Sequence, residues 1–270
     1  MSVGKKKALL DADFVIKSVI AKKDESNHLI DLLLEDQTFE FFCHEKILTE
    51  VAAHDVEGAS EWLETKVKNG QITMVSDADM LNQLSSVYRQ GASRKYRDFL
   101  KKSCDAFKTG YYESAFSAVE ELPIDVDDKL FLSELLKCDT AIGPHQSLGE
   151  KKSLILLQLF RELMPGQVYL FCSDDRGARA GVISFADDVK CLSLLSAFCL
   201  LKENGVKQED AEPYFKAYEN HIKEKTNQTQ FRVINQKGDT YLRVDCYQVF
   251  SEIYRDLFID TDAGWLRYKK

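Results

Sequence analysis

Acidic side chains recur in this 270-residue chain at the ends of apolar runs that are typical of buried strands. Asp11 directly follows the run ALL, and Asp174 and Asp175 end the run VYLFCSDD. Glu50 lies in the predicted helix after FEFFC, and Glu150 begins the predicted helix that contains SLILLQLF. Because the carboxyl ends of parallel strands converge on one crevice, we expect these acids to meet although they are distant in the sequence.

The chemistry expected of such a group is binding of a hard divalent cation. Two carboxylates about 4 Å apart repel by ~4 kcal/mol at the effective dielectric of a partly buried pair. Either some of the acids are protonated or a cation lies among them, and ligands that are all oxygen select Mg²⁺ or Mn²⁺. The histidines show no metal-ligand spacing and are expected at the surface or at the edge of the core; they are His28, His44, His54, His145 and His221.

Alternating strand and helix signals predict the elements that position these acids. ALLDADFVIKSVI, FEFFC with HEKILTEVAA, and QVYLFCS with RGARAGVI each resemble a strand followed by a helix, which is typical of a parallel sheet covered on both faces. We therefore predict an α/β fold with a central parallel sheet flanked by helices in three layers. A long stretch with helical periodicity and few strand signals predicts a helical insertion at about 77–140. A hairpin around KGD followed by a helix predicts a small α+β extension at 229–270, after a main domain at 1–228.

The four acidic segments resemble the motifs of the PIN-domain nucleases. LLDADFVI, ILTEV, LGEKKSLILL and FCSDDRGARAG occur in the family's order, over roughly residues 5 to 205 with the insertion between the second and the third. The resemblance implies that the catalytic, metal-binding acids are Asp11, Glu50, Glu150 and Asp175. Asp174 is an alternative ligand because the family's last motif fits SDD in two registers. Asp13 would support the ligands or add one.

The resemblance also implies an activity. The expected protein is a metal-dependent endoribonuclease with Mg²⁺ or Mn²⁺ as cofactor and RNA as substrate; an inhibitor protein and a second copy of the chain are open as further partners. No apolar run is long enough to span a bilayer, so a cytoplasmic location is expected. The net charge of −8 argues against a general nucleic-acid coat, and the seven cysteines lack C-x-x-C spacing, which predicts buried, reduced thiols.

Basic residues in the insertion and after SDD could contact the RNA backbone. On a helix, Arg94, Arg97, Lys101 and Lys108 would share one face, with aromatic side chains interleaved for base stacking. The alternative is an ordinary solvated charged face. Arg176 could contact a phosphate, and Arg179 could either do so or hold its own loop in place.

Two other functions are compatible with the same sequence motifs. DADFV also matches the D-x-D-x-[TV] motif of haloacid dehalogenase-like phosphatases, in which Asp11 would be the nucleophile and Asp13 the general acid. Ser76 and either Lys151 or Lys152 would complete that site, whereas Glu50 and Glu150 would have no part in it. The remaining alternative is a catalytically silent binding module with the nuclease-like fold.

Overall fold

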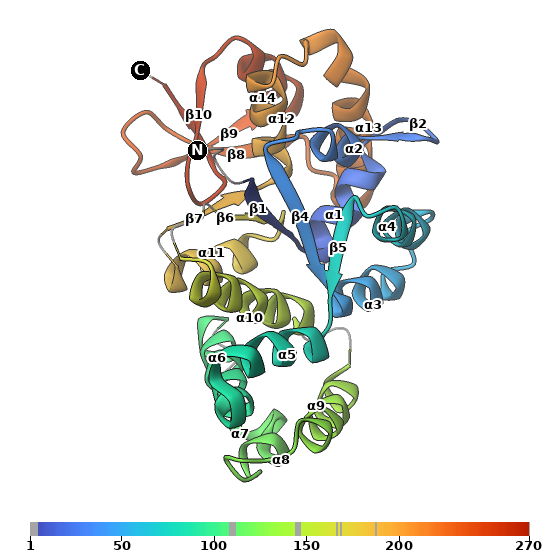
Figure 1. Cartoon of the computed structure of the whole chain (residues 1–270). Helices are drawn as coiled ribbons and strands as arrows, with labels where there is room; N and C mark the ends of the chain where they lie inside the picture. Colours follow the sequence, from blue (N-terminus) through green and yellow to red (C-terminus); the bar gives the residue numbers. More distant parts are fainter. Residues whose placement is uncertain are drawn as a thin grey trace.

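A five-stranded parallel sheet lies at the centre of the computed structural model, which describes residues 5–107, 112–143, 147–165, 167, 169–186 and 188–269 (Figure 1). Lys108 and His145 lie outside the described residues. In spatial order the strands are β5 (Ile72–Val75), β4 (Phe39–His44), β1 (Lys6–Leu10), β6 (Tyr169–Cys172) and β7 (Val189–Leu192). This confirms the predicted three-layer α/β fold.

Alternation along the strands divides the interior into two cores. Ala8 and Leu10 face one apolar cluster, whereas Leu9 between them faces the other, as the two-residue period of a strand requires. Because both faces of β1 are buried, the run reads as continuously apolar rather than alternating.

Each face of the sheet is covered by its own helices. The helices that pack in the first core are α1 (Ala12–Ile20), α2 (Leu29–Leu34), α3 (Glu45–Ala53), α4 (Ala59–Lys68), α12 (Leu194–Glu203), α13 (Gln208–Thr226) and α14 (Cys246–Tyr254). The second core is covered chiefly by α10 (Leu148–Leu163) and α11 (Arg176–Phe185) together with the insertion. The small hairpin of β2 (Lys22–Asp24) and β3 (Asn27–His28) was not predicted, because KKDESNH has no apolar alternation.

The insertion is helical, as predicted, and its helices lie together on one side of the molecule (green in Figure 1). It begins at a capping box in which Ser76 and Asp79 bond each other's backbone N–H groups. Its elements are α5 (Asp77–Tyr88), the short 3-10 helix η1 (Arg89–Gly91), α6 (Ala92–Ala106), α7 (Tyr112–Ala115), α8 (Ser117–Glu120) and α9 (Asp128–Ile142).

The C-terminal extension forms a second, four-stranded sheet on the opposite side of the molecule (Figure 1). Its spatial order is β10 (Phe258–Asp260), β11 (Leu266–Tyr268), β8 (Gln230–Ile234) and β9 (Tyr241–Asp245). The predicted hairpin, β8 with β9, and the predicted helix, α14, are present. Strands β10 and β11 were missed because each has only three residues.

The extension shares the first core with the main sheet. Phe231 and Phe250 belong to the same apolar cluster as Ala8, and the ring of Phe250 stacks on Phe215 of α13 at 4.5 Å between centroids. Helix α13 is therefore buried along one side. The predicted boundary at residue 228 falls within this continuous packing.

All seven cysteines are among the described residues, where they are buried and form no disulfide. Within the same residues, no helix combines the length and the apolar character needed to cross a bilayer.

Candidate functional site

The candidate acids lie near the carboxyl ends of β1 and β6, where the order of the strands in the sheet reverses. From β1 the chain proceeds outward to β4 and β5 and then returns to the other side of β1 as β6. In open parallel sheets, ligands bind in the crevice outside the carboxyl ends of the strands at such a point. Asp11 follows β1 and Ser173 follows β6 at this position.

Asp11 is held rigidly at the mouth of the crevice. Its side chain is buried, its backbone N–H donates to the Cys172 carbonyl (2.9 Å), and the Ser173 hydroxyl donates to its Oδ2 (2.7 Å). Burial, followed by repulsion from Glu150, raises the pKa of Asp11 well above its ordinary value; Glu50 and Asp13 add to this repulsion. Asp11 therefore lies within the electrostatic reach of both distant glutamates, as the sequence predicted.

Glu50 reaches the crevice from α3 and is held by the first turn of α10. Its Oε1 accepts a hydrogen bond from the Gly149 N–H at 2.8 Å. Burial and repulsion from Glu150 raise the pKa of Glu50 from 4.5 to about 7. A Cβ at position 149 would lie 2.2 Å from Glu50 Oε2, so only glycine allows this approach. Sequence reasoning missed Gly149; the available signal was a glycine immediately before Glu150 in a helical run.

Glu150 lies in the first turn of α10, and its two carboxylate oxygens have different environments. Its Oε2 is buried and has no hydrogen-bond partner among the described residues. Burial raises the pKa of Glu150, and repulsion from Asp175 contributes. Lys151 lowers the pKa of Glu150 and of Glu50 but does not bring either back to its ordinary value.

The structure separates the roles of the two consecutive aspartates. Asp174 Oδ1 accepts from the Leu194 N–H (3.1 Å), and Oδ2 accepts from Lys17 Nζ (2.8 Å) and the Tyr218 hydroxyl (3.2 Å). Burial would raise the pKa of Asp174, but Lys17 outweighs it and the pKa is lowered. Both oxygens are thus engaged, and these contacts fit an anchor of the loop better than a metal ligand.

Asp175 remains the candidate ligand after β6. It caps α11 by accepting a hydrogen bond from the Ala178 N–H at Oδ1 (2.8 Å), and it lies close enough to raise the pKa of Glu150. Asp13 is bound to Lys17 at 2.8 Å, and burial raises its pKa. Lys17 therefore joins Asp13 to Asp174 beside the four candidate acids.

The basic residues predicted to contact RNA have different environments. The prediction for Arg97 is wrong: its side chain is buried and donates hydrogen bonds to the carbonyls of Leu122 (2.8 Å) and Pro123 (3.2 Å). From α6, Arg97 thus supplies hydrogen-bond donors to the backbone carbonyls of the loop after α8. Arg94 is exposed, and Lys101 is paired with Glu113 at 3.3 Å.

The arginines after SDD also differ from each other. Arg176 is exposed. Arg179 is buried and donates hydrogen bonds to the carbonyls of Ser173 (2.8 Å) and Ala263 (3.1 Å). Of the two roles predicted for Arg179, holding the loop is the one its contacts fit.

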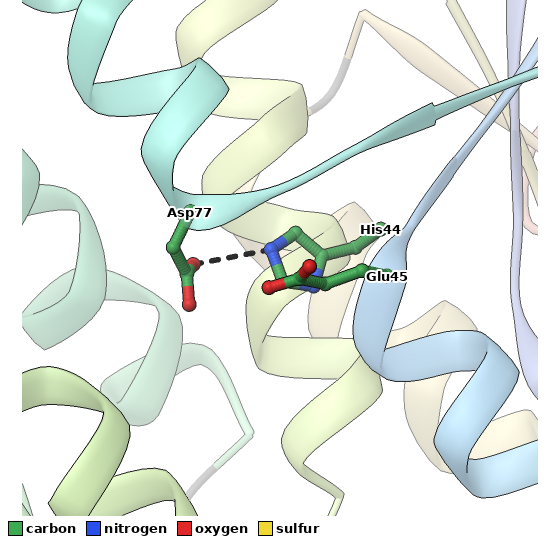
Figure 2. A group of neighbouring side chains, drawn as sticks. All are labelled: His44, Glu45 and Asp77. Atoms are coloured by element: carbon green, nitrogen blue, oxygen red, sulfur yellow. Dashed lines mark hydrogen bonds and ion pairs between the residues drawn. The ribbon is translucent and has the colours of Figure 1, made fainter. Parts of the chain in front are cut away.

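A second polar group lies at the ends of β4 and β5. Figure 2 shows His44, Glu45 and Asp77, whose potential ligand atoms all lie within 4.8 Å of one another. Among the described residues, no three of the acids around Asp11 approach one another this closely. His44 was expected at the surface or core edge but is fully buried; its Nδ1 accepts from the Lys46 N–H (3.2 Å), so Nε2 donates to Asp77 Oδ1 (3.1 Å).

A lysine already supplies the positive charge in this second group. Lys152 is fully buried, and its Nζ lies 2.8 Å from Asp77 Oδ2 and 3.1 Å from Asp139 Oδ2. The Tyr96 hydroxyl also donates to Asp77. Burial would raise the pKa of Asp77, but Lys152 and His44 hold it well below 3.8. We therefore interpret this group as an ionic network that joins α5, α6, α9 and α10.

Comparisons with protein-family models, curated proteins and solved structures found no match to this chain. The interpretation of the site therefore depends on its own geometry and on the sequence motifs.

Stability in the presence of a chelator should fall as the pH rises, because Glu50 titrates near neutrality. Its pKa is about 7 when folded and 4.5 ordinarily, so between these values the folded state binds more protons than the unfolded state. The contribution of Glu50 to stability is then fully present below pH 4.5 and decreases by about 1–3 kcal/mol by pH 8. Glu50→Gln should flatten this dependence in urea titrations at pH 5 and pH 8. An equally steep decrease in the variant would contradict the assignment.

Gly149→Ala should disrupt the crevice without unfolding the protein. The added Cβ would meet the Glu50 carboxylate and the Ile47 Cδ1 at 2.8 Å, so Glu50 must leave its position. We expect loss of the Mn²⁺-induced rise in melting temperature and at least a roughly tenfold fall in any cleavage activity. Gly91→Ala is the matched control, because the nearest atom to its Cβ is Tyr88 Cβ at 3.9 Å. An unaltered response of Gly149→Ala to Mn²⁺ would contradict the role of this contact.

Proposed function

We propose that the protein is a metal-dependent endoribonuclease that hydrolyses RNA phosphodiester bonds. The observation that carries the proposal is the mutual repulsion of Asp11, Glu50 and Glu150 at the strand-order reversal, where Glu150 Oε2 is buried and has no hydrogen-bond partner in the described part of the chain. Placing several carboxylates where burial and repulsion disfavour their charge is unfavourable for folding, which is typical of functional sites. RNA as the substrate comes from the resemblance to PIN-domain nucleases.

The donor set fits a hard divalent cation. Asp11, Glu50, Glu150 and Asp175 offer only carboxylate oxygens, which suit Mg²⁺ or Mn²⁺ rather than zinc or copper. When bound, such a cation lowers the pKa of a water molecule and neutralises negative charge on the leaving oxygen. A bound cation would stabilise Glu150 Oε2 most directly, because no described residue forms a hydrogen bond to this buried atom.

The surrounding residues orient these acids. Ser173 fixes one oxygen of Asp11, the Gly149 N–H fixes one oxygen of Glu50, and the Ala178 N–H fixes Oδ1 of Asp175. In each case one oxygen has a defined donor, and the carboxylate is held in a single orientation. Lys17 pairs with both Asp13 and Asp174 at 2.8 Å and so reduces the repulsion that these two acids add to the site.

The contacts of the remaining candidates disfavour the phosphatase alternative. Ser76 is engaged in the capping box of α5, and Lys152 is bound to Asp77 and Asp139 in the ionic network. Asp13, the required general acid, is bound to Lys17. The phosphatase would also leave Glu50 and Glu150 unexplained.

The decisive experiment is incubation of the purified chain with a mixed RNA pool in Mn²⁺ or in chelator, followed by sequencing of the cut ends. We expect cleavage only with Mn²⁺ and no release of phosphate from p-nitrophenyl phosphate. Thermal melting with and without Mn²⁺ tests the silent binding module, because a ligand that binds only the folded state raises the melting temperature. Absence of both cleavage and a Mn²⁺-induced shift would overturn the proposal.

A further inference from the structure

A groove runs from Asp174 and Arg176, which flank Asp175 in the sequence, onto the C-terminal extension. Its first part is a cavity of about 460 Å³ between α11, the end of α13, β8 and the turn before β11, and Lys17 and Asp174 contribute to its wall. A second cavity of about 350 Å³ continues across residues 226–230 to Arg243. The two cavities share Thr226, Gln228 and Arg232 in their walls, so they are adjacent, and we treat them together as one groove.

The groove carries uncompensated positive charge although the protein is acidic overall. Arg176, Lys225, Arg232 and Arg243 line it and are exposed. No carboxylate of the described part of the chain lies within ion-pair distance of these four side chains. The basic face of α6 differs, because Lys95 is paired with Glu162 (3.0 Å) and Lys101 with Glu113 (3.3 Å). Exposed cations without acidic partners are available to a polyanion.

The half-buried ring of Trp265 lies in the wall of the groove, and its position is fixed by its neighbours. Trp265 lies 5.4 Å from the guanidinium carbon of Arg179 and 5.9 Å from that of Arg176. Arg179 joins the loop after β6 to the turn that carries Trp265, through the carbonyls of Ser173 and Ala263. Gly264 in that turn has φ +69°, and a Cβ there would lie 3.0 Å from Arg179 Cδ. The ring is thus held at a set position relative to Asp175.

We propose that this groove, defined by Arg176, Lys225, Arg232, Arg243 and Trp265, binds single-stranded RNA beside the bond to be cleaved. Arginine and lysine side chains would contact successive phosphates, and the ring of Trp265 would stack with one base. A duplex cannot use the ring in this way because its bases are already stacked, so the site selects single strands. The assignment of RNA rests on the proposed function, whereas the charge and the ring do not.

Binding is measured with the Asp11→Asn variant in chelator, so that the RNA is not cut. A labelled oligouridine of about 12 nucleotides is titrated by fluorescence anisotropy at several salt concentrations. Removing two phosphate contacts with Lys225→Ala and Arg232→Ala should reduce the slope of log affinity against log salt by about 1.4 and weaken binding at least about tenfold. The control is Lys68→Ala with Lys129→Ala, which removes the same charge from exposed lysines of α4 and α9.

Trp265 provides a second, local readout. The chain has two tryptophans, so Trp62→Phe leaves Trp265 as the only one, and its emission should be quenched as RNA binds. Trp265→Ala should weaken binding by about 5- to 150-fold. Trp265→Phe keeps a ring and should recover part of that loss. Equal affinity for a duplex of the same length, or groove variants that bind like the control, would overturn the proposal.

The outcomes for the groove and for the enzyme are distinguishable. If the wild-type chain cuts RNA but the groove variants bind normally, the groove is wrong and the nuclease stands. If the groove variants lose binding but the wild-type chain cuts nothing in Mn²⁺, the nuclease is wrong and the groove stands as an RNA-binding site.

Discussion

Asp11→Asn is expected to reduce Mn²⁺-dependent RNA cleavage by at least about 100-fold while making the protein more stable in chelator. Asp11 is buried, and Glu150 and Glu50 repel its charge, so removing that charge relieves a penalty of folding. The Asn side chain keeps an oxygen that accepts from the Ser173 hydroxyl. We expect the melting temperature in chelator at pH 8 to rise by about 2–6 °C, measured by calorimetry.

Asp13→Asn is the control that separates the two enzyme classes. A phosphatase using Asp11 as nucleophile would lose turnover when its general acid is changed, whereas the proposed nuclease would only be weakened. Asp13 is bound to Lys17, so this change should not raise stability as Asp11→Asn does. Lower stability of Asp11→Asn in chelator, or retained cleavage, would contradict the carboxylate cluster.

Lys152→Met should be the most destabilising single substitution among those considered. Met fills a similar volume but leaves Asp77 and Asp139 buried without the ammonium group that lies 2.8 and 3.1 Å from them. Breaking a buried ion pair in this way costs about 3–5 kcal/mol, which urea denaturation measures directly.

A compensated variant shows whether the loss comes from unpaired charge. Adding Asp77→Asn and Asp139→Asn to Lys152→Met removes both carboxylates that lose the Lys152 ammonium group, of which Asp139 also lies 3.4 Å from Lys46, and should restore more than half of the lost stability. A loss below about 1 kcal/mol for Lys152→Met alone would show that the ionic network contributes little.

The sequence predicted the arrangement of the sheet because its signals are local. The apolar run before Asp11 and the helical text after it identify β1 and α1, and the same pairing recurs before Asp175. The expectation that Asp11, Glu50 and Glu150 come within electrostatic reach of one another came from a general rule of parallel sheets. None of these inferences required knowledge of a specific contact between distant side chains.

The parts that could not be predicted depend on such contacts. Arg97 reads as an exposed basic residue, and only the fold shows that it satisfies the carbonyls around Pro123. Asp174 and Asp175 are equivalent in the sequence until Lys17 and Tyr218 engage the first of them. Gly149 reads as a poor helix residue, although its missing side chain makes room for Glu50.

The two added segments also determine how far the chain can be shortened. The insertion supplies Asp77, Tyr96 and Asp139 to the ionic network around Lys152, and the extension supplies Phe231 and Phe250 to the first core. Cutting away either segment would strand a buried charge or uncover packed rings. We therefore expect that the central sheet with its two helical layers folds stably only when both segments are present.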